Sequence, residues 1–198
     1  MTGSYVALEG IEGAGKSTVA VLLDERLRDR GVDVVSVREP GGTAVGERIR
    51  RVLLDPEGTM EPWTEALLFA AARSQLAREV VGPALAEGKT VLSDRSVYSS
   101  LAYQGGGRAL GLEAVRRVNE AALGGIWPDR VVLLQVDAET GMNRERDRDR
   151  IGSEGVALQR RVAGVYGELA AAEPGRFIVV DASRDLAEVV AEIEGVLI

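Results

Sequence analysis

The chain has 198 residues, 45% of them hydrophobic, and a formal net charge of -7 at pH 7. This length and apolar content predict a folded chain with a sizeable core, because disordered chains are poor in apolar residues. The acidic charge disfavours nucleic acid as a partner, since neutralising its phosphates requires a basic surface.

Along the chain, short apolar runs alternate with longer segments of helical periodicity. The apolar runs predict strands at 5–9, 33–37, 90–94, 131–136 and 176–181. Helical patterns lie between and after them, at 16–30, 44–54, 63–87, 96–103, 113–123, 138–147, 155–173 and 185–197. Because the strands are apolar throughout, we expect parallel strands buried on both faces. The alternation predicts an α/β fold with right-handed crossovers.

Several features that the sequence lacks narrow its chemistry. It has no cysteine and no histidine, which excludes disulfides, thiolate nucleophiles, Cys- or His-ligated metals and imidazole acid–base catalysis. A reaction must then use carboxylates, arginines, lysine, backbone amides and, where a metal takes part, a hard cation held by oxygens. No apolar run approaches the roughly 18 residues of a membrane span, and no signal peptide is recognisable. We expect no membrane partner and, by default, a cytoplasmic location.

The first predicted strand runs into a glycine-rich stretch, Gly10-Ile11-Glu12-Gly13-Ala14-Gly15-Lys16-Ser17-Thr18. Its spacing, with four residues between two glycines and then lysine and serine, is that of a phosphate-binding loop. Backbone N–H groups of such a loop surround phosphate oxygens, and the following helix N-terminus adds positive potential. The strand before and the helix after favour this interpretation over a simple capping turn. We expect Ser17 to help hold Mg²⁺.

Four further segments distinguish this chain among the many proteins with such a loop. They are VREPGGTAVGERIR at 37–50, ALLFAAARSQ at 66–75, LSDRSVYSSLAYQGGGR at 92–108 and GMNRERDRDRI at 141–151. Together with GIEGAGKST, and in this order, they resemble the thymidylate kinase family over nearly the whole chain. The resemblance implies the P-loop nucleoside monophosphate kinase fold, with a five-stranded parallel sheet flanked by helices. It implies one kinase domain over 1–198, a lid at about 141–155, and a homodimer.

The implied reaction transfers the γ-phosphate of ATP to dTMP, with Mg²⁺ as cofactor, and gives ADP and dTDP. In this reading all nine residues of the loop at 10–18 bind ATP, and Lys16 is catalytic. The chemistry agrees with the composition. The acceptor phosphate has a second pKa of about 6 and is mostly a dianion at neutral pH, so no general base is needed. The enzyme must align two anions and cancel their charge, which calls for arginines and lysine.

Asp94 and Arg95 follow the 90–94 strand, at the carboxyl edge where parallel sheets build their sites. Asp94 resembles the family's carboxylate that acts on Mg²⁺ through water, so Ser17 and Asp94 are the expected metal residues. Arg95 resembles the clamp on the acceptor phosphate, and we expect it to be catalytic. On the sequence alone, a surface ion pair closing the strand is the alternative.

The expected acceptor site comes from several segments. Phe69 and Arg73 share a helix face, where the ring can stack on thymine and the guanidinium can donate to a carbonyl. A core phenylalanine is the alternative for Phe69. In the family, the loop of Tyr103, Gln104 and the glycines after them lies beside the deoxyribose and base. The full expected set for dTMP is Glu12, Glu39, Phe69, Arg73, Arg95, Ser100, Tyr103 and Gln104, with Arg38 bracing Glu39.

Arg144, Arg146 and Arg148 alternate with carboxylates in a segment almost without apolar side chains. A solvated, salt-bridged helix is the usual interpretation of such a run. The family has its lid here, and Gly13 leaves the phosphate loop without an arginine, so we expect all three to be candidates for a catalytic arginine. The match is imperfect, because three residues are missing before 149–151 and the glutamate usual after them is a glycine.

Two other functions stay open. One is a P-loop kinase of another nucleoside monophosphate, which the pairing of Phe69 with Arg73 and of Tyr103 with Gln104 disfavours. The other is a nucleotide-binding regulator without turnover, which the intact loop lysine and the residues after the 90–94 strand disfavour.

Overall fold

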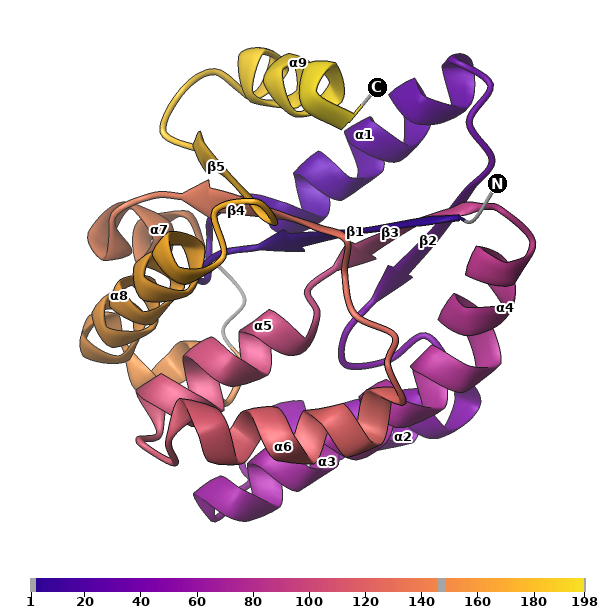
Figure 1. The fold of residues 1–198 in the computed structure, drawn as a ribbon. Coiled ribbons are helices and arrows are strands. Elements are labelled where there is room, and N and C mark those ends of the chain that lie inside the picture. The colour runs from indigo at the N-terminus through magenta and orange to yellow at the C-terminus, as the bar shows by residue number, and fades with distance from the viewer. Residues whose placement is uncertain (1–2, 146–148, 198) are drawn as a thin grey trace.

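The computed structural model describes residues 3–145 and 149–197 (Figure 1). In this part of the chain, five parallel strands form one sheet in the order β2-β3-β1-β4-β5. The strands are β1 (Ser4–Glu9), β2 (Val34–Arg38), β3 (Thr90–Asp94), β4 (Arg130–Gln135) and β5 (Phe177–Asp181). Each begins and ends within one residue of its predicted segment, so the predicted α/β fold with a parallel sheet is confirmed.

Helices cover both faces of the sheet. The α-helices of the described chain are α1 (Lys16–Asp29), α2 (Ala44–Leu54), α3 (Pro62–Leu76), α4 (Gly82–Ala86), α5 (Val97–Ser100), α6 (Leu112–Leu123), α7 (Ala138–Arg144), α8 (Val156–Ala172) and α9 (Leu186–Leu197). Helices α1 and α9 pack together on one face, while α3 to α6 lie on the other (Figure 1). Among the described residues, no helix is both long and apolar enough to cross a membrane.

The helix predicted over 63–87 is interrupted. Between α3 and α4 the chain forms a π-helical turn, η1 (Ala77–Val81). Pro83 lies two residues after Val81, and it lacks the N–H that a regular helix needs while its ring crowds the preceding turn. A wider π turn accommodates such a proline without ending the helix.

The glycine loop expected after Tyr103 is also helical. It belongs to a second π-helix, η2 (Leu101–Gly107), which continues α5. A β-carbon on Gly105 would lie 3.0 Å from the side chain of Leu112 in α6, and one on Gly107 would lie 2.9 Å from Leu158 in α8. The glycines therefore permit close packing between η2 and its neighbouring helices, so the expectation of a loop here is wrong.

The strand register places the functional segments at one edge of the sheet. Leu8 of β1 and Arg38 of β2 both pair with Asp94 of β3. The segments that follow β1, β2 and β3 therefore leave the sheet at the same level. This edge is the carboxyl edge, where the sequence predicted the site.

Candidate active site

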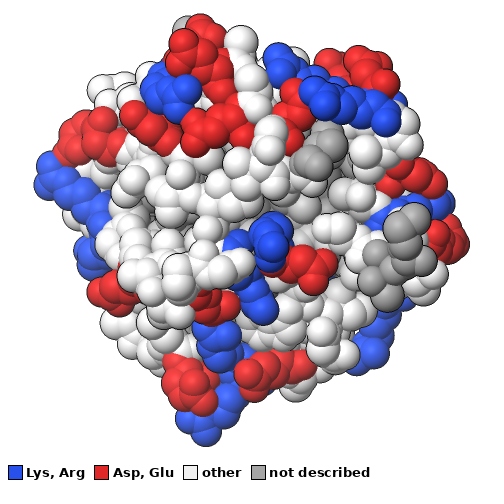
Figure 2. Space-filling view, turned by 45° about the horizontal axis from the view of Figure 1, so that its top comes forward, with Lys and Arg blue, Asp and Glu red and all other residues white. Residues whose placement is uncertain are grey.

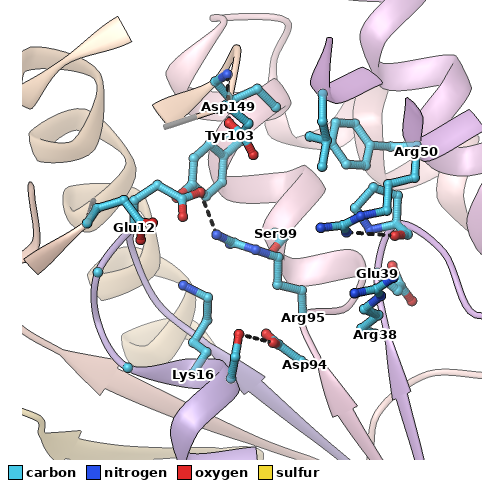
Figure 3. Close-up of a pocket in the computed structure, with 18 of the residues that line it drawn as sticks. Glu12, Lys16, Arg38, Glu39, Arg50, Asp94, Arg95, Ser99, Tyr103 and Asp149 are labelled. Atoms are coloured by element: carbon cyan, nitrogen blue, oxygen red, sulfur yellow. Dashed lines mark hydrogen bonds and ion pairs between the residues drawn. The ribbon is translucent and has the colours of Figure 1, made fainter. Parts of the chain in front are cut away.

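A cavity of about 580 Å³ opens at the carboxyl edge. In Figure 3, Lys16 and Glu12 lie on one side of it, Arg38 and Glu39 lie on the opposite side, and Arg95 stands between them. On the face shown in Figure 2, basic and acidic side chains form small interspersed groups rather than a broad basic area. The cavity lining also mixes the two charges, and its basic side chains are those that can hold an anion: Lys16, Arg38, Arg50, Arg95 and Arg144.

The phosphate loop has the backbone that its glycines predict. Gly13 and Gly15 adopt φ angles of 70° and 90°, in the left-handed region that glycine favours, and α1 begins directly afterwards at Lys16. The ammonium of Lys16 is buried and donates a 2.7 Å hydrogen bond to the carbonyl of Ile11. Burial, reinforced by the nearby Arg95 guanidinium, lowers the pKa of Lys16 to about 8.

The two predicted metal residues are in direct contact. The Ser17 hydroxyl donates a 2.6 Å hydrogen bond to Oδ2 of Asp94. A hydroxyl beside a carboxylate is a donor set that suits Mg²⁺, which binds one or two protein oxygens and keeps phosphate and water oxygens for the rest. Among the described residues, no group of three or more acidic side chains could hold a metal ion by itself. A cation at Ser17 and Asp94 would therefore depend on phosphate and water oxygens.

Arg95 connects the loop after β3 to the phosphate loop. Its backbone has a φ of 73°, unusual for a residue with a side chain, and its Nη2 donates a 2.6 Å hydrogen bond to Glu12. The guanidinium also lies over the ring of Tyr103, 5.3 Å from its centre. Burial is the largest single influence and disfavours the charged form of Arg95, but Glu12, Tyr103, Tyr166 and Asp94 together outweigh it and raise the pKa of Arg95.

Glu9, at the end of β1, holds the segment after Arg95 in place, a role that the sequence analysis missed. Its fully buried carboxylate accepts hydrogen bonds of 2.6–3.0 Å from the backbone N–H and hydroxyl groups of both Ser96 and Ser99. The hydroxyl of Tyr166 in α8 donates a further bond of 2.7 Å. Ser99 also accepts a 3.3 Å bond from Arg95, so Glu9 acts on the arginine through Ser99.

Most of the predicted acceptor residues surround the same cavity. Its lining includes Glu12, Glu39, Phe69, Arg95, Tyr103 and Gln104. The hydroxyl of Tyr103 donates a 3.1 Å bond to Gln159 in α8, which also accepts from the backbone N–H of Glu12. The cavity therefore brings the acceptor residues and the phosphate loop together.

Arg73 and Ser100 lie behind this lining. Arg73 is 2% exposed. Among the described residues its hydrogen-bond partners are Glu39 (2.6 Å), Ser100 (3.0 Å), Asn119 (2.5 Å) and the carbonyl of Ser96 (3.1 Å). These contacts use four of the five N–H donors of a guanidinium, so at most one is left for a ligand. The expectation that Arg38 braces Glu39 is wrong, because Arg73 does so and Arg38 pairs with Glu47 instead.

The arginines of the 141–155 segment have different surroundings. Arg144 lines the cavity and donates a 3.0 Å bond to the carbonyl of Ala182, just after β5. Arg150 is buried and bonds to the carbonyl of Leu53 and to Glu65, at 2.9 and 2.7 Å. Arg146 and Arg148 lie outside the described residues.

A sequence model of the family "Thymidylate kinase" matches residues 8–193 of the chain. The chain belongs to the thymidylate kinase family. A thymidylate kinase from Desulforudis audaxviator is 51% identical over 93% of this chain and 86% of its own length. Those from Deinococcus radiodurans and Halothermothrix orenii are 47% and 46% identical, over 96% and 98% of this chain and 94% and 95% of their own lengths. The similarity to thymidylate kinases does not favour the two other functions left open by the sequence.

Sequence reasoning missed one arginine of the cavity, Arg50. Arg50 of α2 lines the cavity and donates a 2.9 Å bond to the carbonyl of Pro40. Burial, with Arg38 nearby, lowers the pKa of Arg50. The available signal was its position three residues after Glu47, on the helix that follows the REPGGT segment shared with this kinase family.

Proposed function

We propose that this chain transfers the γ-phosphate of ATP to dTMP, giving ADP and dTDP. The observation that carries the proposal is the convergence of two half-sites in one cavity. The phosphate loop, with Lys16 and Ser17, supplies a donor site, and Phe69 and Tyr103 border space for a planar base and its sugar. Arg95 lies between the two halves, where the transferring group has to pass.

On the donor side, the backbone N–H groups of residues 10–18 would surround the phosphates of ATP, and Lys16 would contact the β- and γ-phosphates. Ser17 and Asp94 would hold Mg²⁺, Asp94 acting through water, and the cation would offset negative charge on the phosphates. The carbonyl of Ala182 and the 181–185 segment would border the adenine.

On the acceptor side, Arg95 would clamp the phosphate of dTMP, with Glu12 and Glu39 nearby. Phe69 would stack on the thymine while Arg73 and Gln104 would bind its polar edge, Ser100 supporting Arg73. Tyr103 would pack under the deoxyribose and leave little room for a 2′-hydroxyl. Because the acceptor is already a dianion, these residues contribute by positioning and charge cancellation rather than by removing a proton.

The segment at 141–155 would act as a lid within a single kinase domain spanning 1–198. A closed lid would add a positive charge from Arg144, Arg146 or Arg148 beside the transferring phosphoryl group and exclude water. The contact of Arg144 with Ala182 supports an approach of this segment to the donor side.

The proposal includes a homodimer. Neighbouring helices α2 and α3 expose large apolar side chains, with Val52 55% and Leu67 53% exposed. Such side chains on adjacent helices are suited to a contact with a second copy. Sedimentation should give a dimer for the wild type and a monomer for the double variant Val52→Asp/Leu67→Asp. Val21 in α1 is equally exposed, and Val21→Asp should stay dimeric.

A cytoplasmic location is also part of the proposal.

The test of the reaction is a coupled assay of ADP release with dTMP, dUMP, dCMP, dGMP and dAMP as acceptors and with Mg²⁺ present or chelated. We expect Mg²⁺-dependent turnover with dTMP as the preferred acceptor. A preference for another monophosphate would support the sister-kinase alternative. ATP binding without turnover on any acceptor would instead support a regulator.

A further inference from the structure

Glu65, near the start of α3, is a buried carboxylate with three side-chain partners. It is 1% exposed, and its Oε1 accepts a 2.8 Å hydrogen bond from Nε2 of Gln104. Arg108, just after η2, donates bonds of 3.1 and 2.9 Å to its two oxygens. Arg150, within the 141–155 segment, adds a bond of 2.7 Å.

These contacts keep Glu65 ionised. Burial alone would raise the pKa of Glu65, but the hydrogen bonds from Arg108, Gln104 and Arg150 outweigh burial and lower it. An ionised carboxylate can only accept hydrogen bonds. The amide of Gln104 must therefore turn its NH₂ group to Glu65, because its carbonyl oxygen would face a second acceptor.

This orientation decides which polar atom Gln104 offers to a ligand. Gln104 lines the cavity, and so does Phe69. The Nε2 group uses one of its two N–H donors on Glu65, and with Nε2 held there the amide cannot turn over. The carbonyl oxygen is then the hydrogen-bond acceptor that Gln104 offers to a bound base. Thymine carries a donor at N3–H, whereas the N3 of cytosine is an acceptor, so the two bases differ at the atom that this carbonyl would meet.

We propose that Glu65 is a positioning residue that fixes the amide of Gln104 so that its carbonyl selects a base with a donor at N3. The inference rests on the proposed function, since it assumes that the base lies against Gln104. Glu65 itself lies behind Gln104 and acts through it. The arginine contacts have a part in this, because they keep the carboxylate charged in a buried position.

The substitution Glu65→Gln tests this directly. A glutamine at position 65 can donate as well as accept, so the amide of Gln104 can turn over and present NH₂ to the cavity. Selection at N3 is then lost, and cytosine is no longer opposed by an acceptor. We expect the ratio of kcat/KM for dTMP to that for dCMP to fall by about tenfold or more. The variant Glu65→Asp keeps a group that can only accept hydrogen bonds, so its ratio should stay close to that of the wild type.

The control for losing a buried charged contact is Glu194→Gln. Glu194 in α9 is also largely buried and pairs with two arginines, Arg26 and Arg30, away from the cavity. The ratio of kcat/KM for dTMP to that for dCMP should be the same in Glu194→Gln as in the wild type. Gln104→Leu should lower the ratio, and adding Glu65→Gln to it should cause no further change, since Glu65 acts through Gln104. A ratio of two acceptors is independent of the fraction of active enzyme.

A second measurement uses only the folded wild type. The 3-deaza analogue of dTMP replaces N3–H by C–H, and its kcat/KM should be about tenfold or more below that of dTMP, a difference that Gln104→Leu removes. If the wild type prefers dTMP but treats the analogue like dTMP, or if Glu65→Gln keeps the wild-type ratio, the role of Glu65 is refuted while the proposed function stands. Failure of the wild type to phosphorylate dTMP would overturn both.

Discussion

Gly13 of the phosphate loop and Gly141 of α7 are in such close contact that neither has room for a side chain. A β-carbon on Gly13 would overlap the carbonyl of Gly141, and one on Gly141 would lie 2.5 Å from the carbonyl of Glu12. The helix that leads into the lid segment therefore packs directly on the loop proposed to hold ATP. A side chain added at either glycine would have to displace the backbone of the other segment, and backbone moves less easily than a side chain.

Gly13→Ala should destabilise the protein more than Gly15→Ala does. Both positions have left-handed φ angles, so both substitutions carry a similar backbone cost of about 1–2 kcal/mol. Only Gly13 meets a neighbouring backbone, whereas a β-carbon on Gly15 has nothing within 4 Å among the described residues. We expect an extra loss of about 1–3 kcal/mol for Gly13→Ala, seen as a lower Tm. Equal Tm values for the two variants would contradict the close contact.

Lys16→Met should lower kcat by several orders of magnitude while the protein stays folded. The ammonium is proposed to offset charge that builds up on the β- and γ-phosphates, an effect that is strongest in the transition state. Methionine has a similar length and fits the buried stem. Turnover at saturating ATP and dTMP, with Tm as the check on folding, measures this. A variant that keeps a tenth of wild-type kcat would exclude the proposed role.

The lowered pKa of Lys16 predicts how activity depends on pH. With a pKa of about 8 in the free enzyme, kcat/KM for ATP should fall as the pH rises through 8. Bound ATP is an anion and favours the charged lysine, so kcat should persist to higher pH than kcat/KM. Unfolding would not explain the fall. Because the unfolded chain binds this proton more tightly, the lysine's contribution to stability grows as the pH rises above 8. A flat kcat/KM profile between pH 7 and 9 would refute the assignment.

The sequence predicted those parts of the site that depend on local spacing. Continuous apolar runs gave the strands to within one residue, and the spacing from Gly10 to Ser17 placed the phosphate loop between β1 and α1. Parallel strands share a carboxyl edge, so the convergence of the segments after β1, β2 and β3 also followed from the pattern.

Contacts between distant segments could not be predicted in this way. Glu39 and Arg73 are separated by 34 positions, and nothing in the local pattern distinguishes Arg73 from Arg38 as the partner of Glu39. Glu65 occupies an ordinary helical position, and its importance depends on where α3 lies against η2 and the lid segment. Such contacts depend on side-chain packing across elements, for which the sequence has no periodic signal.

Arg73→Ala should reduce both stability and base selectivity. Arg73 pairs at 2.6 Å with Glu39, a buried carboxylate whose pKa is raised by burial even beside the arginine. Removing one partner of such a buried pair costs about 3–5 kcal/mol, because the other charge is left without compensation. The proposed donation to thymine is lost as well, so the preference for dTMP over dCMP should narrow by about one to two decades.

The control for this prediction is Arg26→Ala, which breaks a partly exposed pair with Glu194 and should cost about 1 kcal/mol or less. Thermal unfolding and steady-state kinetics with both acceptors separate the two effects of Arg73→Ala. A lower Tm with an unchanged preference would leave Arg73 with a structural role only. Equal kcat/KM for dTMP and dCMP in the wild type would exclude base reading by Arg73 altogether.

The lid arginines should divide into catalytic and structural members. Charge on the transferring phosphoryl group needs a partner besides Lys16 and Mg²⁺, and Gly13 provides none in the phosphate loop. An arginine supplied for this purpose is worth about 10³–10⁵ in turnover in related phosphoryl transfers. We therefore expect alanine at one of Arg144, Arg146 or Arg148 to lower kcat by at least about a hundredfold, with little change in Tm.

Arg150→Ala should give the opposite result. Its guanidinium is buried between the carbonyl of Leu53 and the carboxylate of Glu65, so its loss leaves both acceptors short of a donor and should lower Tm clearly. Its effect on kcat should be smaller, because these contacts occupy the groups that would otherwise reach the phosphates. An alanine series over the four arginines, assayed at saturating ATP and dTMP with Tm measured in parallel, distinguishes the two roles. If every variant keeps more than about a third of wild-type kcat, the segment supplies no catalytic charge, and the cavity arginine Arg50 becomes the next candidate to test.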